Sequence, residues 1–232
     1  MLGGKRITLI AAMARNRAIG RDGVFDPDRV GRVLDEIGAE VFALQEVQSG
    51  RTGRALIHQL RDRLGAEAIS GVTLLRKDAE YGNAILTRYP VRSVERLDLS
   101  VSRHEPRGAL DVLLDAGTTP LRVLATHLGL WPYERRRQVR RLLAALAAGP
   151  DVPTVLMGDI NEWFLWGRPL RWLHLQFRRT PAPATFPAYR PVFALDRLWV
   201  RPRAVLQQLA VHASPLARVA SDHLPLVATL KW

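Results

Sequence analysis

Apolar residues recur at helical spacing in several stretches of this chain. In the segment FDPDRVGRVLDEIG, one buried helix face is indicated by Val30, Val33, Leu34 and Ile37. Asp26 stands where an N-cap belongs, and Pro27 occupies the first helical position. Gly38 suits a left-handed C-terminal cap. The pattern therefore predicts a helix between Asp26 and Gly38.

The same spacing appears further along the chain. The segment ERRRQVRRLLAALAAGP carries an apolar stripe and then Gly149 and Pro150, which predicts a second helix; the stripe consists of Val139, Leu142, Leu143 and Leu146. RALIHQLRDRLG indicates another helix that ends at Gly65. The stretch from Glu162 to Phe193 is rich in proline, and we expect a long loop there with one short helix around Pro169 to Phe177.

Short apolar runs of strand length lie between these helices. They are ITLIAAM, VFALQ, NAILT, LRVLAT, PTVLM, LDRLWV and LPLVATL. Strands that alternate with helices, with some strand-to-strand neighbours, predict an α/β fold with helices packed outside sheets. The 232 residues are 47% hydrophobic, enough for one sizeable core. No linker or repeat divides the chain, so we expect a single domain over residues 1–232, with residues 1–19 forming an atypical first strand.

Composition narrows the class of protein. The chain has no cysteine, which excludes disulfides and thiolate metal sites. No apolar run is long enough to span a bilayer, and the stretch from Ile7 to Ala14 is too short for a signal peptide, so a soluble cytoplasmic protein is expected. The net charge of +12 favours polyanionic partners such as nucleic acid or anionic lipid. An arginine-rich composition inherited from a GC-rich genome explains that charge equally well. No stable protein partner is inferred.

Polar residues follow or open many of the predicted strands. These candidates are Glu46, His127, Asp159, Asn161, Asp196, Asp222 and His223. In α/β folds, polar groups at strand ends assemble functional sites. Carboxylate and amide oxygens suit Mg²⁺ or Mn²⁺, and histidines suit proton transfer. The absence of HExxH, GxSxG and GxxxxGK[ST] motifs argues against a zinc protease, a serine hydrolase and a P-loop NTPase.

These residues stand in motifs that carry a family resemblance. In order, the motifs are LQEV, GNAILTR, THL, GDIN, LDRL and SDHLP. From about Gly20 to the C-terminus the chain resembles the endonuclease/exonuclease/phosphatase superfamily, which includes deoxyribonuclease I and the exonuclease III type of abasic-site endonuclease. The resemblance implies a four-layer α/β/β/α sandwich of two mixed β-sheets with outer helices. It also implies a divalent-metal-dependent enzyme that hydrolyses phosphodiester bonds.

The resemblance further implies a role for each candidate. Glu46 would bind Mg²⁺ or Mn²⁺ with support from Asp222, and Asp159 would orient and deprotonate the attacking water. Asn161 would hold the phosphate or the metal shell. His223, oriented by Asp196, would stabilise charge or protonate the leaving oxygen, while His127 would contact the phosphate from the other side. The remaining histidines and Arg88 and Arg107 are assigned no role, the arginines because this residue type is so frequent here.

The substrate stays open at this point. Nucleic acid, DNA or RNA, is favoured slightly over a phospholipid or a small phosphate ester, and a weakly active or inactive binding module of the same fold is the other alternative. Four tryptophans flank His127 and Asn161, and they would stack on a base or sugar, border a lipid surface or pack on the sheet; they are Trp131, Trp163, Trp166 and Trp172. For ERRRQVRR, from Glu134 to Arg141, the solvated face of an amphipathic helix is favoured over a nucleic-acid patch.

The N-terminal segment departs from the family pattern. The family places an asparagine at the end of its first strand, and the corresponding position here is Ala14. The segment ITLIAAMARNRAIGRDG instead resembles the opening of dihydrofolate reductase, but the tryptophan, proline and acid that follow in reductases are missing, so a reductase function is rejected. Because alanine cannot replace the asparagine's hydrogen bonds, and Asn16 lies too far along a strand to do so, we predict weak activity that Ala14→Asn would raise.

Overall fold

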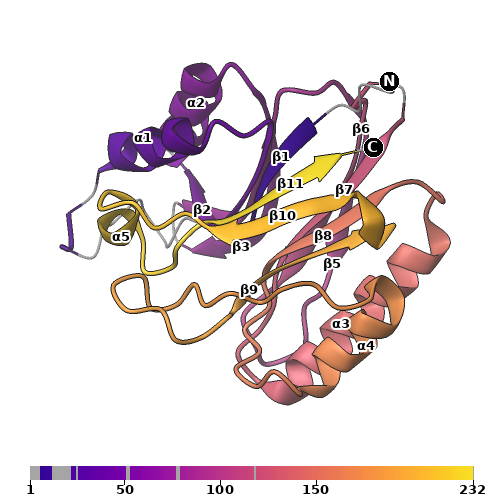
Figure 1. The fold of residues 1–232 in the computed structure, drawn as a ribbon. Helices are drawn as coiled ribbons and strands as arrows, with labels where there is room; N and C mark the ends of the chain where they lie inside the picture. Colours follow the sequence, from indigo (N-terminus) through magenta and orange to yellow (C-terminus); the bar gives the residue numbers. More distant parts are fainter. Residues whose placement is uncertain are drawn as a thin grey trace.

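The computed structural model describes residues 6–11, 22–24, 26–50, 53–76, 79–117 and 119–231. Two β-sheets lie face to face, with helices on their outer sides (Figure 1). The first half of the chain contributes β1 (Arg6–Ala11), α1 (Pro27–Ile37), β2 (Val41–Gly50), α2 (Gly53–Leu64), β3 (Glu67–Arg76), β4 (Ala79–Thr87), β5 (Val91–Asp98) and β6 (Gly108–Leu114). The second half contributes β7 (Leu121–His127), α3 (Pro132–Ala148), β8 (Thr154–Asp159), α4 (Arg168–Phe177), β9 (Asp196–Arg201), the 3-10 turn η2 (Arg203–Val205), β10 (Leu206–Val211), α5 (Ala217–Ala220) and β11 (Leu226–Lys231).

Both sheets are mixed, as predicted. The six-stranded sheet has the order β10-β11-β1-β2-β4-β3, with β1 and β2 parallel and the other neighbours antiparallel. The five-stranded sheet has the order β5-β6-β7-β8-β9, in which only β7 and β8 are parallel. The parallel pair matters for the site, because the carboxyl ends of β7 and β8 lie at the same edge of the sheet.

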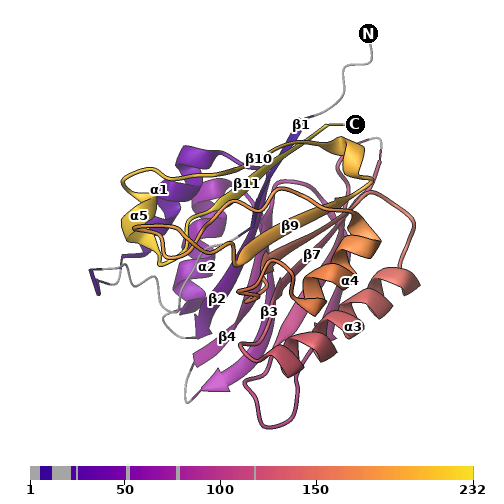
Figure 2. The same ribbon diagram turned by 60° about the horizontal axis from the view of Figure 1, so that its bottom comes forward.

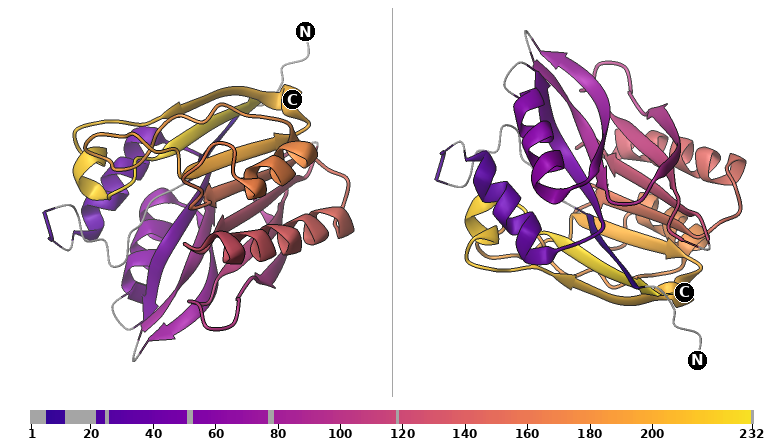
Figure 3. Two further views of the ribbon diagram at one scale, coloured as in Figure 1. Left: turned by 90° about the horizontal axis from the view of Figure 1, so that it is seen from below. Right: turned by 90° about the horizontal axis from the view of Figure 1, so that it is seen from above.

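Three apolar layers hold the sandwich together. Between the sheets, the apolar side chains of β2, β4, β6, β7 and β8 pack against one another, with Ala43, Ile85, Val112, Val123 and Met157 fully buried. Helices α1 and α2 cover the outer face of the first sheet, and α3 and α4 cover that of the second (Figures 2 and 3). The predicted four-layer α/β/β/α architecture is therefore confirmed.

The helix predicted between Asp26 and Gly38 forms with the expected caps. The Asp26 carboxylate accepts a hydrogen bond from the backbone N–H of Arg29 at 2.9 Å, and Pro27 is the first helical residue. Gly38 ends the helix at φ 62°, a left-handed conformation that glycine adopts at little cost. The short helix predicted around Pro169 to Phe177 is also present, as α4.

Four strands were not predicted from the sequence: β3, β5, β6 and β10. Three of them, β3, β5 and β10, are sheet edges, and along β5 most side chains are exposed or half-exposed, which weakens the apolar signal. β6 is buried, but Asp111 interrupts its apolar run. No helix in the described part of the chain combines the length and apolar character that crossing a bilayer requires. Ala14 and Asn16 lie outside the described residues.

Candidate active site

Strand register brings three of the predicted residues side by side. His127 is the last residue of β7 and Asp159 the last of the parallel strand β8, and the two are register partners. Asp196 opens the antiparallel strand β9 directly opposite Asp159. Three neighbouring strands thus place an imidazole and two carboxylates in one row at the edge of the second sheet.

Gly158 allows the close approach of β7 and β8 just before this row. Its φ is 141°, a value that side-chain-bearing residues rarely adopt, and a Cβ on it would lie 1.8 Å from the carbonyl oxygen of Thr126. The glycine of the GDIN motif is therefore required by backbone geometry, and its role is to keep Asp159 in register with His127.

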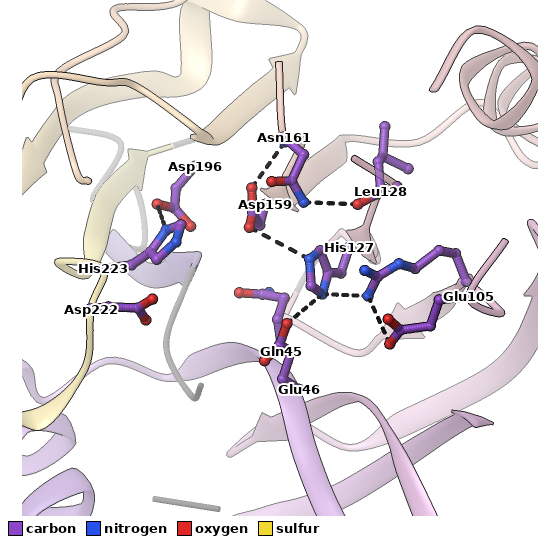
Figure 4. A network of polar contacts seen from close by, with 12 residues as sticks. Gln45, Glu46, Glu105, His127, Leu128, Asp159, Asn161, Asp196, Asp222 and His223 are labelled. Carbon is purple, nitrogen blue, oxygen red and sulfur yellow. Dashed lines mark hydrogen bonds and ion pairs between the residues drawn. The ribbon is translucent and has the colours of Figure 1, made fainter. Parts of the chain in front are cut away.

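Asp222 and His223 reach the row from the loop before β11, in the other sheet. The His223 Nδ1 atom lies 2.8 Å from the Asp196 Oδ2 atom, and Asp196 is almost fully buried. Burial alone disfavours a charged imidazole, but the neighbouring carboxylates, Asp196 first, outweigh it and raise the pKa of His223 to about 10. His223 is therefore a cation at neutral pH, with its ring held by Asp196 (Figure 4).

Glu46 comes from the first sheet, but its position differs from the prediction that a strand ends just before it. β2 continues to Gly50, and Glu46 sits at a bulge where the pairing with β4 shifts between Leu44 and Val47. Its φ of 54° is left-handed, which is uncommon for a residue other than glycine. A bulge of this kind re-aims a side chain, and here the Glu46 Oε1 atom lies 3.8 Å from Nδ1 of His127 in the other sheet.

All seven predicted residues line one pocket of about 290 Å³. Asn161 is held on the far side of Asp159: its backbone N–H donates to Asp159 Oδ1 and its side-chain amide donates to the Leu128 carbonyl, both at 2.9 Å. Its φ is 53°, a second left-handed residue in the site. In Figure 4, Asp159 lies between the Asp196–His223 pair and His127, with Glu46 below. Strained backbone at two site residues is typical of functional positions.

His127 is buried and neutral. Burial, and then the charges of Arg107 and His223, lower the pKa of His127 well below its ordinary value. Its Nδ1 atom lies 3.1 Å from Nη1 of Arg107, and because arginine can only donate, Nδ1 accepts and the proton is assigned to Nε2. Nε2 lies 3.5 Å from Asp159 Oδ2, and Nδ1 lies 3.8 Å from Glu46 Oε1. These contacts to carboxylates are made by an uncharged ring.

The pKa of Asp159 differs from that of an exposed carboxylate. Burial, followed by the negative charge of Asp196, raises the pKa of Asp159 to about 7, against the opposing effect of the His223 cation. A carboxylate with this basicity accepts a proton more readily than an ordinary aspartate. The site therefore combines a basic carboxylate, a cationic imidazole and a neutral imidazole.

The pocket offers the few carboxylate ligands that a magnesium ion needs, not a complete set of protein ligands around a metal. Among the described residues, no three Asp, Glu, His or Cys side chains converge as a ligand set. Mg²⁺ is commonly held by one or two carboxylates, with water and substrate phosphate completing its shell. Glu46, whose side chain is 36% exposed, and Asp222 both line the pocket and offer oxygen ligands of that kind. These donors fit the metal that the resemblance implies.

The sequence analysis assigned no role to several residues that line the pocket, including Gln45, Glu105 and Arg107. Arg107 precedes β6 and contacts His127, and Gln45, beside Glu46, is buried with its amide donating to the Ala43 carbonyl. Arg88, also unassigned, is structural: its guanidinium donates to the Leu64 carbonyl. The four histidines without an assigned role do not line the pocket; they are His58, His104, His174 and His212.

The four tryptophans divide into two groups. Trp172 is partly buried against the helices of the second sheet, with the Arg140 guanidinium 5.0 Å from its ring centre. Trp131 and Trp166 are 64% and 73% exposed, so packing on the sheet is the wrong interpretation for these two, whereas Trp163 is 41% exposed and packs against Phe186 and Phe193. In the Glu134 to Arg141 segment, Arg137, Arg140 and Arg141 are exposed, whereas Glu134 and Arg135 are buried. The solvated face thus accounts for only part of the segment.

The structure is an α/β/β/α sandwich with a pocket at one end of its two sheets, and acidic residues and histidines line that pocket. A sequence profile of the Endonuclease/Exonuclease/phosphatase family matches residues 15–223, and the chain belongs to this family. Membership supports the hydrolysis of phosphate esters as the class of reaction, and so supports an enzyme. The chain is also 30% identical over 215 residues to the uncharacterized protein YbhP of Escherichia coli strain K12, covering 84% of each protein.

Solved structures share the fold. An endonuclease/exonuclease/phosphatase from Beutenbergia cavernae superposes with a TM-score of 0.78 at 21% identity, over 98% of this chain and 72% of that one. ANGEL2, a 2′,3′-cyclic phosphatase solved with adenosine-2′,3′-vanadate, gives 0.75 at 15% identity, over 99% and 96%. The human Nocturnin catalytic domain, solved with a sulfate anion, gives 0.73 at 18% identity, over 98% and 95%. At these identities the likeness concerns the fold.

Proposed function

We propose that this protein is a magnesium- or manganese-dependent phosphodiesterase whose reaction is carried out in the pocket between the two sheets. The observation that carries the proposal is the row of His127, Asp159 and Asp196 on adjacent strands, completed by His223. Asp159 is the base, the His223 cation is the acid and neutral His127 is a hydrogen-bond donor, and all three line the same pocket. When bound at Glu46 and Asp222, the metal ion would neutralise phosphate charge and stabilise the developing negative charge.

The protein's own residues divide the reaction between them. Asp159 takes a proton from water as its oxygen attacks phosphorus, and Asn161 fixes the position of the Asp159 carboxylate. His127 donates from Nε2 to a phosphate oxygen. The bond from phosphorus to the leaving oxygen breaks, and His223, held by Asp196, gives its proton to that oxygen. The products are a phosphate monoester and an alcohol, and the proton that Asp159 gains is matched by the proton that His223 loses.

Turnover of bis(p-nitrophenyl) phosphate with Mg²⁺ and with EDTA tests this proposal. Release of nitrophenolate that needs the metal is expected. Full turnover in EDTA would end the metal-dependent mechanism, and no turnover under any condition would favour a binding module of the same fold. Nucleic acid as the substrate remains a prediction that rests on the net charge of +12. If it holds, DNA cleavage should fall steeply as salt rises.

A further inference from the structure

Two loops beside the pocket expose large apolar side chains. The loop between β7 and α3, with the start of α3, exposes Leu130, Trp131 and Tyr133, and the loop between β8 and α4 exposes Phe164, Leu165 and Trp166. Each of these six side chains is between 52% and 73% exposed. We call them the apolar rim. Large exposed apolar side chains gathered beside a pocket are typical of interaction sites on soluble proteins.

The two loops are adjacent and firmly held. They leave the carboxyl ends of the parallel strands β7 and β8, at one edge of the sheet. The buried Arg135 guanidinium joins them: it donates to the carbonyl oxygens of Gly129 and Leu130, and its Nε lies 3.2 Å from the Glu162 carboxylate. The Gly167 N–H donates to the Phe164 carbonyl at 2.9 Å, which closes a tight turn. The rim is thus presented on a fixed base.

The rim runs into the wall of the pocket. Leu130 is a rim residue that also lines the pocket, and Trp163, next to Phe164, lines it too. The Trp163 ring packs against Phe186 at 5.9 Å between ring centres, and Phe186 lies 4.8 Å from the His223 ring. Whatever covers the rim therefore lies at the mouth of the pocket.

The chemistry of the rim fits a lipid surface better than a nucleic acid. Bases stack on aromatic faces along a basic groove, but Leu130 and Leu165 are aliphatic and offer no such face. Membrane interfaces take up this mixture of tryptophan, tyrosine, phenylalanine and leucine. Exposed cations stand beside the rim, since Arg137 donates to the Tyr133 hydroxyl and Arg168 follows Trp166 by two residues. With a net charge of +12, the surface complements anionic head groups.

We propose that the apolar rim docks this protein onto a bilayer that contains anionic phospholipid. The rim enters the head-group region while the flanking arginines bind phosphates. Docking brings the phosphodiester of a lipid head group to the pocket, a step that rests on the proposed function. The docking itself does not, because it needs no hydrolysis.

Co-sedimentation with vesicles tests the proposal in EDTA, where turnover plays no part. We expect wild-type protein to bind phosphatidylcholine vesicles that contain phosphatidylglycerol, and to bind pure phosphatidylcholine more weakly. Leu165→Ala/Trp166→Ala should weaken binding at least about tenfold, since it removes two of the three most exposed apolar side chains of the rim. Trp131→Ala, on the other loop, should weaken it independently. The matched control is Leu175→Ala on α4, which removes an 86% exposed leucine outside the rim and should change nothing.

Three outcomes would overturn the proposal. Vesicle binding that is absent in the wild type would do so, as would binding that Leu165→Ala/Trp166→Ala and Trp131→Ala leave unchanged. So would a double variant that loses binding to a single-stranded oligonucleotide, or loses self-association, while it keeps vesicle binding. Turnover of bis(p-nitrophenyl) phosphate should persist in these variants, because none of the three residues lines the pocket. Failure of docking is thereby separated from failure of the active site.

Discussion

Arg107 donates a hydrogen bond from Nη1 to Nδ1 of His127 over 3.1 Å, and both side chains are buried. The bond selects the tautomer with the proton on Nε2, which leaves that nitrogen as a donor within the pocket. An arginine twenty residues away in sequence thus determines which ring nitrogen of His127 can donate a hydrogen bond in the pocket. This relationship makes Arg107 a positioning residue in the proposed mechanism.

Replacing Arg107 should therefore slow turnover without unfolding the protein. Arg107→Met keeps bulk but removes the donor, so His127 can adopt either tautomer, and kcat should fall by about 10–100-fold, the scale typical of groups that orient a functional imidazole. Steady-state kinetics on bis(p-nitrophenyl) phosphate would measure the loss. The matched control is Arg92→Met, an exposed arginine of β5 paired with Asp115, which should leave kcat unchanged. Wild-type kcat in Arg107→Met would remove the arginine from the mechanism.

Asp159→Asn should abolish most of the activity. The amide keeps the shape of the carboxylate but cannot accept a proton from water, so kcat should fall by about 10²–10⁴. The fold should survive, because the change relieves the repulsion between Asp159 and the facing Asp196. Asp151→Asn, in an exposed turn, is the control for a generic loss of charge. An Asp159→Asn protein with near-normal turnover would require another base.

Glu46→Gln should act on metal affinity. The amide retains one oxygen but loses the negative charge, so the Mg²⁺ concentration for half-maximal turnover should rise by at least about tenfold, and saturating metal should restore part of the rate. Titration of turnover with Mg²⁺ measures this. Glu95→Gln, on the exposed face of β5, should leave the titration unchanged. Equal metal requirements in Glu46→Gln and wild type would exclude Glu46 as a ligand.

The seven candidate residues chosen from the sequence line one pocket, whereas four of the strands were not predicted. Glu46, His127 and Asp159 were candidates because each stands in a short motif, where neighbours in sequence carry the signal; His127 and Asp159 end strands, whereas Glu46 lies within β2. Arg107 was missed because its partner lies on the next strand and arginine is common in this chain. The bulge at Glu46 depends on pairing between β2 and β4, which no local pattern records.

β6 shows why a buried strand can also be missed in a prediction from sequence. Asp111 breaks its apolar run, and that residue type is depleted in buried strands. The structure resolves the conflict through Arg122 on β7, whose Nε donates to Asp111 Oδ1 at 2.9 Å while the same guanidinium donates to the Ala145 and Leu146 carbonyls near the end of α3. Burial of the acid is tolerated only because a second strand and a helix end supply its partner and fix that partner's position.

Asp111→Ala should accordingly destabilise the protein. It leaves the buried Arg122 charge without its carboxylate, a change that typically costs about 3–5 kcal/mol, and for a chain of this size Tm should fall by roughly 6–20 °C. Thermal unfolding followed by circular dichroism measures the shift. Asp115→Ala, which breaks the exposed pair with Arg92, should cost no more than about 1 kcal/mol. Equal Tm values for the two variants would show that the buried pair adds no more than the exposed one.

Gly158→Ala should damage stability and activity together. The new Cβ would lie 1.8 Å from the Thr126 carbonyl, so β7 and β8 must separate next to the register pair His127 and Asp159. Gly65→Ala separates this collision from the cost of a left-handed backbone, because Gly65 also has a positive φ, of 57°, but has open space where the methyl would go. The Gly65 variant should lose about 1 kcal/mol of stability and keep full kcat.

Gly158→Ala should lose more than about 3 kcal/mol of stability, and the molecules that remain folded should turn over at least about tenfold more slowly, because small misplacements of reacting groups are costly. Unfolding curves and kcat per folded molecule would show this. If both variants lost the same stability and kept wild-type kcat, the close approach of β7 and β8 would have no part in aligning His127 with Asp159.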